Sequence, residues 1–198
     1  MQKIIDRREW LDRLEIGALD GSDIGDVLDV LARGLRDNPL HVVAFGEDPE
    51  RRRQGLRTLI SAAFAFKDVS HTLVARREDG VIVGVCCMLP PCDSLPDLGQ
   101  RLWLLPALVP TGPGAAGRHW HLGPVAVDAH LQGMGVGSRL MQVFCARMDA
   151  AGEDAYLETD KPMNVRFFEG FGFDVVDEQE VLGFPNWIML RKVEGRRG

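Results

Sequence analysis

Three glycines at alternate positions, Gly133, Gly135 and Gly137, separate a predicted strand over 119–127 from a predicted helix. A helix begins with unpaired backbone N–H groups and a partial positive charge, and glycines ahead of it let a bulky anion approach those donors. The apolar face of this helix comprises Leu140, Met141, Phe144, Cys145 and Met148. The pattern predicts a phosphate-binding corner, and its alternative is a tight strand-to-helix turn without a ligand.

A nicotinamide dinucleotide is the first ligand to consider for such a turn. Its binding motif needs a further glycine where this chain has Ser138, and it opens a parallel β-α-β unit. Here two strands of a predicted hairpin, joined across Glu78-Asp79-Gly80, precede the turn instead. The spacing therefore disfavours a nicotinamide site.

The rest of the chain alternates strands with helices. Further strands are expected at 14–19, 71–76, 81–88, 155–159, 173–179 and 187–192. One helix is expected to be capped by Ser22 or Asp23 and to end at Asn38-Pro39. A second helix is expected to begin with Asp48 as its cap, and a short one to cover 162–168. This order predicts an α/β (α+β) fold in which a mixed sheet is covered on its faces.

Length and charge limit the function classes. A chain of 198 residues with 45% hydrophobic content is expected to form one domain, 1–198. A net charge of -6 disfavours a nucleic-acid partner, because phosphate binding requires clustered cations. No apolar run approaches the ~20 residues that span a bilayer, and residues 1–12 are charged where a signal peptide would be apolar. We therefore expect a cytoplasmic protein that has no membrane contact.

The chain has four cysteines: Cys86, Cys87, Cys92 and Cys145. They show no paired CxxC spacing and no histidines that would complete a zinc site, so no metal is expected. We expect reduced, mostly buried thiols. The basic run Arg51–Arg53 is expected to fan across a solvated helix face.

Three segments in the last third of the chain resemble one known family. The turn Gln132–Gly137, "QGMGVG", follows the strand Val125–Val127 and matches the Q/R-x-x-G-x-G/A motif of the GCN5-related N-acetyltransferase (GNAT) superfamily. The segment "NVRFFEGFGF", Asn164–Phe173, is similar to the family's N-x-x-x-x-(F/Y)-(Y)-E-x-x-G-F pattern. "YLET", Tyr156–Thr159, lies where the family's fifth strand is expected. Together these motifs define a cofactor-binding part over 118–173.

The resemblance implies a fold and a co-substrate. The fold is a mixed, mostly antiparallel central sheet of about seven strands flanked by about four helices. The co-substrate is acetyl-coenzyme A or a close acyl relative. In the family its pyrophosphate lies on the amides of the turn, which here are those of Gln132, Gly133, Met134, Gly135, Val136, Gly137 and Ser138.

The pantetheine arm of the co-substrate would run beside the strand Val125, Ala126 and Val127. This implies that the fourth strand, 119–127, and the fifth, 155–159, splay apart beyond Val127.

Three residues of the final helix are expected near the same arm. Asn164 would reach it, and Phe167 or Phe168 would cover it; a helix cap and two core aromatics are the alternative. The family often has a tyrosine as general acid at the position of Phe168, whereas the only tyrosine of this chain is Tyr156.

The resemblance also implies how an acetyl group would be transferred. The N–H of Val125 would stabilise the oxyanion, and Glu158 matches a general-base glutamate of some family members. His119 and His121 share one strand face, and either could relay the proton. An ordinary paired carboxylate and a structural histidine are the alternatives.

We therefore expect an N-acetyltransferase that passes acetyl directly to the amine of a small-molecule acceptor in a ternary complex. The alternatives are a noncatalytic acyl-coenzyme A binding or sensing module and a protein N-terminal acetyltransferase. Acceptor contacts are expected from 38–47 and 90–118, with 98–108 and its Trp103 as a lid. A monomer or a homodimer is expected, because 187–192 is predicted to be an edge strand that could pair with another copy.

Overall fold

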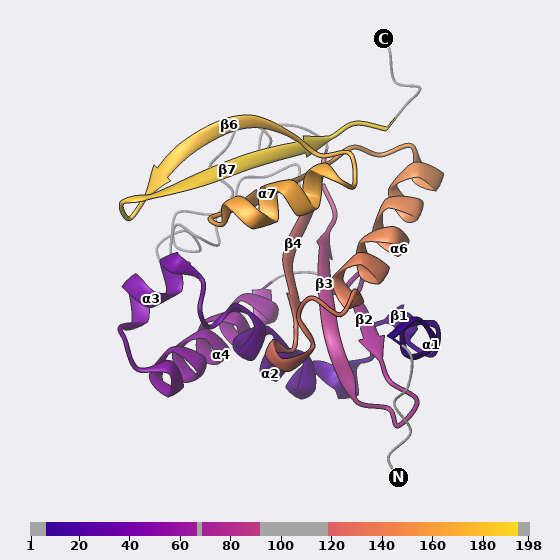
Figure 1. The fold of residues 1–198 in the computed structure, drawn as a ribbon, viewed down its shortest axis with the longest axis horizontal. Helices are drawn as coiled ribbons and strands as arrows, with labels where there is room; N and C mark the ends of the chain where they lie inside the picture. Colours follow the sequence, from indigo (N-terminus) through magenta and orange to yellow (C-terminus); the bar gives the residue numbers. More distant parts are fainter. Residues whose placement is uncertain (1–6, 67–68, 92–118, 194–198) are drawn as a thin grey trace.

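The structure, a computed structural model, describes residues 7–66, 69–91 and 119–193 (Figure 1). Its strands are β1 (Glu15–Ala18), β2 (Leu73–Arg76), β3 (Ile82–Leu89), β4 (Trp120–Val127), β5 (Ala155–Thr159), β6 (Asp174–Val181) and β7 (Phe184–Arg191). Its α-helices are α1 (Arg7–Asp12), α2 (Ile24–Leu35), α3 (Pro39–Phe45), α4 (Pro49–Phe66), α6 (Val136–Ala151) and α7 (Pro162–Glu169). Two short 3-10 helices are η1 (Gly21–Asp23) and η4 (Ala129–Leu131).

The seven strands form one sheet in the order β1-β2-β3-β4-β5-β7-β6. β4 and β5 run parallel, and every other neighbouring pair is antiparallel. The predicted mixed, mostly antiparallel sheet is thereby confirmed. The described ranges contain six α-helices. The expectation of about four was too low, because the sequence pattern did not predict α1 and α3.

The sheet separates two apolar layers. On one face, side chains of α6 and α7 such as Phe144 and Phe168 are buried against the strands. On the other face the buried side chains come from α2 and α4, among them Leu31 and Ile60. In Figure 1 the hairpin of β6 and β7 arches above α7, and α6 lies beside β3. Successive residues of β4 and β5 therefore face different layers.

The starts of the first long helices follow local capping chemistry. Asp48 caps α4 as predicted, because its Oδ1 accepts from the N–H groups of Glu50 (2.8 Å) and Arg51 (3.1 Å). Asp23, one of the two predicted candidates, lies at the N-cap position of α2, but its side chain makes no cap hydrogen bond to that helix. It accepts instead from the N–H of Asp20, and the two aspartates form a capping box around the 3-10 turn η1 that leads into α2.

The dipeptide Asn38-Pro39 ends one helix and begins another. α2 ends at Leu35, shortly before the predicted end at Asn38-Pro39, but Pro39 is the first residue of α3. The fixed φ of proline suits the first helical position, where no N–H is required. A seven-residue helix has too few turns for its apolar spacing to stand out.

The edge strand of the sheet differs from the prediction. β7 lies between β5 and β6, so the edge is β6 rather than 187–192. Sequence order suggests that the last strand is outermost, but the hairpin folds β7 back against β5. The exposed edge carries Asp174, Glu178 and Glu180, and such charges discourage pairing with another strand.

The basic run Arg51–Arg53 does not lie entirely on a solvated face. Arg52 is 6% exposed and donates to the carbonyls of Arg36 (3.1 Å), Gly46 (3.0 Å) and Glu47 (2.7 Å). It also pairs with Asp37 at 2.7 Å. The prediction was wrong for this residue, because carbonyls beyond the end of α2 and before α4 need a donor there.

Some predictions fall outside the described residues. Cys86, Cys87 and Cys145 are buried thiols outside any disulfide, as expected, but Cys92 lies outside the described ranges. So do 98–108, with Trp103, and most of 90–118. In the part of the chain that the structure describes, no helix is long and apolar enough to cross a membrane. Within the same ranges no three His, Cys, Asp or Glu side chains gather as metal ligands.

Candidate active site

β4 and β5 part from one another inside the sheet. They pair only at Trp120 with Ala155 and at His121 with Tyr156, so the strands separate from Leu122 onward. The splay was predicted, but it begins earlier than the expected point beyond Val127.

A bulge in β4 accounts for the early separation. The β3 residues Cys86 and Met88 pair with Val125 and Leu122, so β4 has one extra residue at Gly123-Pro124. A bulge bends its strand and increases the local twist. Proline also lacks an N–H to donate to a neighbouring strand.

Beyond the bulge, β4 presents peptide groups to the opening. The N–H of Asp128 donates to the carbonyl of Val83 at 2.9 Å, and alternate residues of a strand point to the same edge. Ala126 therefore pairs with β3, whereas the N–H groups of Val125 and Val127 point toward β5. No described strand pairs with them there. Of the three predicted residues on this strand, Ala126 thus offers no free peptide group.

The start of α6 provides a second set of donors at the same opening. Its N-cap residue, Gly135, has φ +101° and has no side chain that could cap the helix. The N–H groups of Val136, Gly137 and Ser138 precede the first complete helical turn and therefore have no acceptor within the helix. The N–H of Met134 instead donates to the carbonyl of Leu131 at 3.2 Å. Met134 is thus an unsuitable amide donor for an anion, against the expectation.

The side chain of Gln132 holds the turn in place. Its Nε2 donates to the carbonyls of Gly34 and Val127, both at 3.2 Å. Nearby, Arg33 of α2 donates to Asp128 at 2.8 Å. Burial raises the pKa of Asp128, but the hydrogen bonds and charges of Arg33 and His130 together outweigh it, so the net shift is downward. These contacts join α2 to the end of β4.

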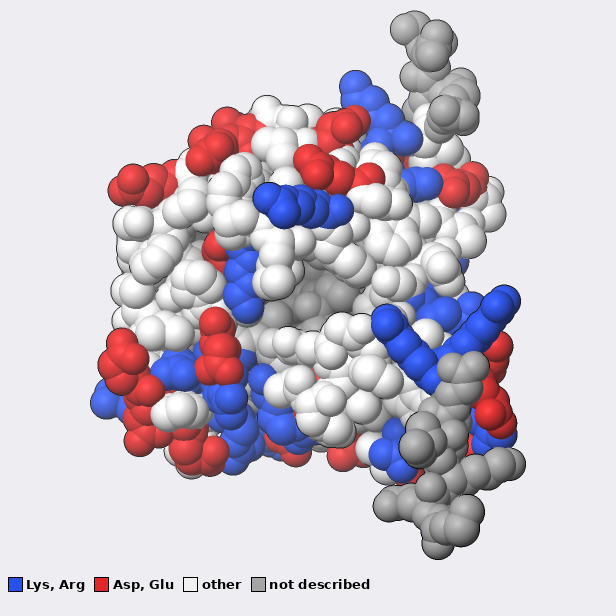
Figure 2. All heavy atoms as spheres, viewed as in Figure 1, with Lys and Arg blue, Asp and Glu red and all other residues white. Residues whose placement is uncertain are grey.

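Phe167 of α7 lies against the start of α6. A Cβ on Gly137 would lie 3.6 Å from the ring of Phe167 and 3.7 Å from Val127. Phe168, in contrast, is 7% exposed and belongs to the core, where its ring lies 6.0 Å from that of Phe173. Figure 2 shows the surface hollowed between the parts that carry α7 and the start of α6. Phe167, rather than Phe168, therefore borders the opening.

Asn164 of α7 lies close to β5. Its Nδ2 donates to the hydroxyl of Thr159 at 3.1 Å. It makes no side-chain cap at the start of α7, since the cap position is Lys161. The helix-cap alternative for Asn164 is therefore excluded.

On the opposite face of the sheet, His121 and Glu158 come together at the point where the strands separate. His121 Nε2 lies 3.0 Å from Glu158 Oε2, and the imidazole stacks on Tyr156 with a centroid distance of 4.8 Å. A carboxylate accepts hydrogen bonds, so the proton of this contact resides on Nε2. The other two polar atoms, His121 Nδ1 and Glu158 Oε1, are buried and have no described hydrogen-bond partner.

The two predicted histidines have different surroundings. His119 Nε2 lies 4.0 Å from Asp154, at the end of β4 and β5 where the strands remain together. Only His121 contacts Glu158. The sequence could not distinguish between them, because both occupy the same face of one strand.

Two contributors to this region were not singled out from the sequence. Asp160, two residues beyond Glu158, is buried, and its Oδ2 accepts from the N–H of Leu40 at 3.2 Å, which places α3 beside this face. On the other side, Arg7 of α1 donates to the carbonyls of Gly133 and Met134 in the glycine turn. A single arginine in a short charged helix carries no recognisable motif.

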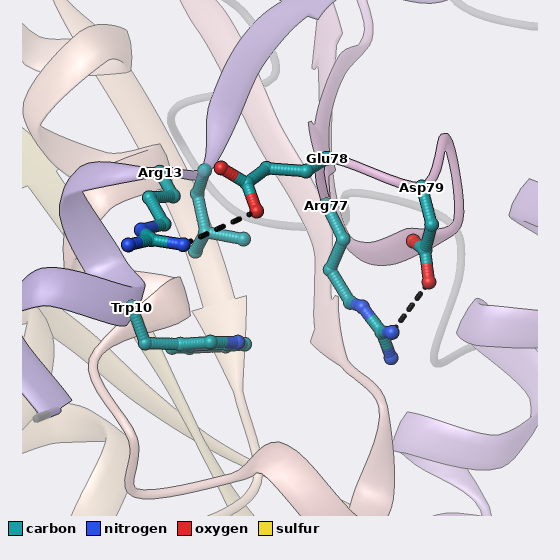
Figure 3. A pocket seen from close by; sticks show the side chains of 6 residues that line it. Trp10, Arg13, Arg77, Glu78 and Asp79 are labelled. Atoms are coloured by element: carbon teal, nitrogen blue, oxygen red, sulfur yellow. Dashed lines mark hydrogen bonds and ion pairs between the residues drawn. The ribbon is translucent and has the colours of Figure 1, made fainter. Parts of the chain in front are cut away.

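A separate pocket of about 350 Å³ lies between α1 and the turn that joins β2 to β3 (Figure 3). Its lining residues are Trp10, Arg13, Leu14, Arg77, Glu78 and Asp79. The charges on its walls are already paired, Arg13 with Glu78 at 3.5 Å and Arg77 with Asp79 at 2.5 Å. The pocket does not include any of the predicted site residues.

Comparisons with solved structures find the same fold in acetyltransferases. A crystal structure of histone acetyltransferase HPA2 and related acetyltransferase from Corynebacterium glutamicum has a TM-score of 0.73 and 22% identity, covering 91% of this chain and 97% of its own. A GNAT family acetyltransferase from Brucella melitensis, in complex with acetyl-CoA, gives 0.56 and 20%, covering 90% and 87%. The PaiA N-acetyltransferase from Thermoplasma acidophilum, in complex with coenzyme A, gives 0.56 and 14%, covering 90% and 98%.

These similarities establish the shared fold. The family model for the acetyltransferase (GNAT) family matches residues 40–173, which include the split strands, the glycine turn and α7. This match covers more than half of the chain. The chain therefore belongs to the acetyltransferase (GNAT) family.

Proposed function

We propose that the protein transfers an acetyl group from acetyl-coenzyme A to the amine of a small-molecule acceptor, directly and within a ternary complex. One observation carries the proposal: two outward-facing N–H groups of β4 and the uncapped start of α6 meet at the opening between β4 and β5. An extended, amide-containing arm that ends in a pyrophosphate satisfies both sets of donors.

In the proposed complex the pyrophosphate lies on the N–H groups of Gly135, Val136, Gly137 and Ser138. The pantetheine arm pairs with the open edge of β4 near Val125 and Val127, and Phe167 and Asn164 border it from α7. The acceptor enters from the face that carries His121 and Glu158. The known complexes of two relatives with acetyl-CoA and coenzyme A support the choice of carrier.

Transfer requires an amine lone pair to attack the thioester carbonyl. The oxyanion that forms would accept from the N–H of Val125, a contribution worth about 10²–10³ in rate where single donors of this kind have been removed. The C–S bond then breaks, and the thiolate leaves. A thiol pKa of about 8.5 makes it a tolerable leaving group without a dedicated acid.

The amine must lose its proton, and Glu158 is the proposed base. Its Oε1 is free of described partners and would take the proton, while Oε2 accepts from His121 Nε2, which orients the carboxylate. Burial, and to a smaller degree the charge of Glu158, raises the pKa of the Tyr156 hydroxyl. Tyr156 is therefore a poor proton donor near neutral pH, and it does not replace the family's acid.

The experiment is a transfer assay in which purified protein, acetyl-coenzyme A and a panel of amines are tested for release of free thiol. Glu158→Gln is expected to lower kcat about 10²–10⁴-fold without changing the KM for acetyl-coenzyme A. Glu180→Gln, the same change on the exposed edge strand, serves as the matched control. Full activity of Glu158→Gln at saturating amine across pH would exclude this base.

The noncatalytic alternative rests on Phe168, which occupies the family's acid position as a buried core residue. A protein that binds acetyl-coenzyme A tightly but releases no thiol with any amine would support an acyl-coenzyme A sensor. Acetylation of short peptides in preference to free amines would support a protein N-terminal acetyltransferase.

A further inference from the structure

The short helix α1 reaches the glycine turn from outside the family motif. The Arg7 guanidinium donates from Nε to the carbonyl of Met134 at 3.0 Å and from Nη2 to that of Gly133 at 2.8 Å. One planar cation thus holds two consecutive carbonyls of the turn.

This contact determines the direction of a neighbouring N–H group. The C=O and N–H of one trans peptide point in opposite directions. A carbonyl of Met134 that points to Arg7 therefore directs the N–H of Gly135 away from Arg7. Gly133 and Gly135 have φ values of +75° and +101°, and glycine has no Cβ to restrict its backbone. An external contact is what limits the conformations of such a turn.

α1 is itself fixed against the molecule. A Cβ on Gly135 would lie 3.0 Å from Leu11 Cδ1, so the helix packs directly on the turn. Trp10 and Leu11 pack against the core layer of α6. Directly after the C-terminal end of α1, Arg13 pairs with Glu78 at 3.5 Å, and Figure 3 shows this pair beside Trp10. Arg7 therefore projects onto the turn from an anchored support.

We propose that Arg7 is a positioning residue for the pyrophosphate of the carrier. It acts through the carbonyls of Gly133 and Met134, and it keeps the N–H of Gly135 aligned with the donors at the start of α6. The inference rests on the proposed function, because the anion is the pyrophosphate of acetyl-coenzyme A. Arg7 donates to the glycine turn and not to the split strands where the thioester would lie, so it affects carrier binding and leaves the chemical step unchanged.

The test compares Arg7→Ala, Arg7→Lys and the control Arg51→Ala, which changes an exposed arginine of α4 that does not contact the turn. Arg7→Ala is expected to raise the Kd for coenzyme A by calorimetry, and the KM for acetyl-coenzyme A, about tenfold, which equals about 1.4 kcal/mol. Its kcat should remain that of the wild type. Arg7→Lys should bind equally weakly, because one ammonium cannot span two carbonyls as a fork does.

A truncated donor separates positioning from a general structural effect. S-acetyl-pantetheine has the thioester and the arm but no pyrophosphate, so Arg7→Ala should use it as well as the wild type does. Equal losses with both donors, rescue of binding by lysine, or unchanged Kd in Arg7→Ala would each overturn the proposal. A wild-type protein that binds no coenzyme A would instead overturn the proposed function itself.

Discussion

His41, the third residue of α3, shows how burial determines the protonation state of one side chain. It is 9% exposed, and its Nδ1 donates to the carbonyl of Leu35 at 2.8 Å. Burial lowers the pKa of His41, and this effect exceeds the opposing influence of the Leu35 carbonyl and the charge of Asp160. The folded protein therefore favours the neutral imidazole.

This shift predicts a loss of stability on acidification. The folded pKa lies below the unfolded value of about 6.5, so as the pH falls below that value the unfolded chain binds the proton first. The free energy of unfolding should then decrease with falling pH until the folded pKa is reached. His41→Asn keeps a donor for Leu35 but does not titrate. In urea unfolding at several pH values, its stability should improve relative to the wild type below pH ~6.5; a constant difference would contradict the assignment.

Individual residues mark the limit of sequence inference in this protein. Gln132 and Glu158 could be proposed as site residues from the family resemblance, and the structure places them at the glycine turn and at the split strands. The roles of Phe167 and Phe168 could not be separated, since adjacent residues of a helix point in different directions that depend on the packing of α7. The burial of Arg52 could not be predicted either, because most of its hydrogen-bond partners are backbone carbonyls.

At the scale of elements, the contact between α2 and β4 aligns the end of the split strand. Gly34 of α2 approaches so closely that a Cβ there would lie 2.7 Å from the carbonyl oxygen of Val127 and 3.0 Å from Ala126. The same glycine's carbonyl accepts from Gln132. The position of the helix is thus linked to the glycine turn.

Gly34→Ala should therefore destabilise the protein by about 1–3 kcal/mol, because a backbone oxygen cannot move aside as a flexible side chain can. Gly25 lies in the same helix, and a Cβ there would meet nothing within 4 Å. Gly25→Ala should leave stability unchanged or raise it by up to about 1 kcal/mol. Urea unfolding measures both, and equal effects of the two changes would show that the close approach is unimportant.

Strands and long helices were predictable as elements, whereas their assembly was not. Alternating and helical spacings identified β2 to β5, α4 and α6 with small errors at their ends. α1 and α3, of six and seven residues, are too short for periodicity to show, and tertiary packing stabilises such helices. The position of β7 inside the sheet depends on how the hairpin folds back, which no local pattern encodes.

For the molecule as a whole, carrier binding should appear as increased thermal stability. A ligand that binds only the folded state at 100 times its Kd adds about 2.7 kcal/mol. For a chain of 198 residues, this corresponds to a rise in Tm of about 5–10 °C. Differential scanning calorimetry with acetyl-coenzyme A should show it, and S-acetyl-pantetheine at the same concentration should give a smaller rise. An unchanged Tm with the complete carrier would contradict the proposed site.

A β-sheet normally separates the two halves of a domain, yet here the separation of β4 and β5 leaves an opening between these two strands. The glycine turn lies on one side of that opening, and His121 with Glu158 lies on the other. Two reactants that arrive from opposite sides would meet at one point without competing for the same volume. The half that receives the amine could then be remodelled for a new molecule while the half that holds the donor stays as it is.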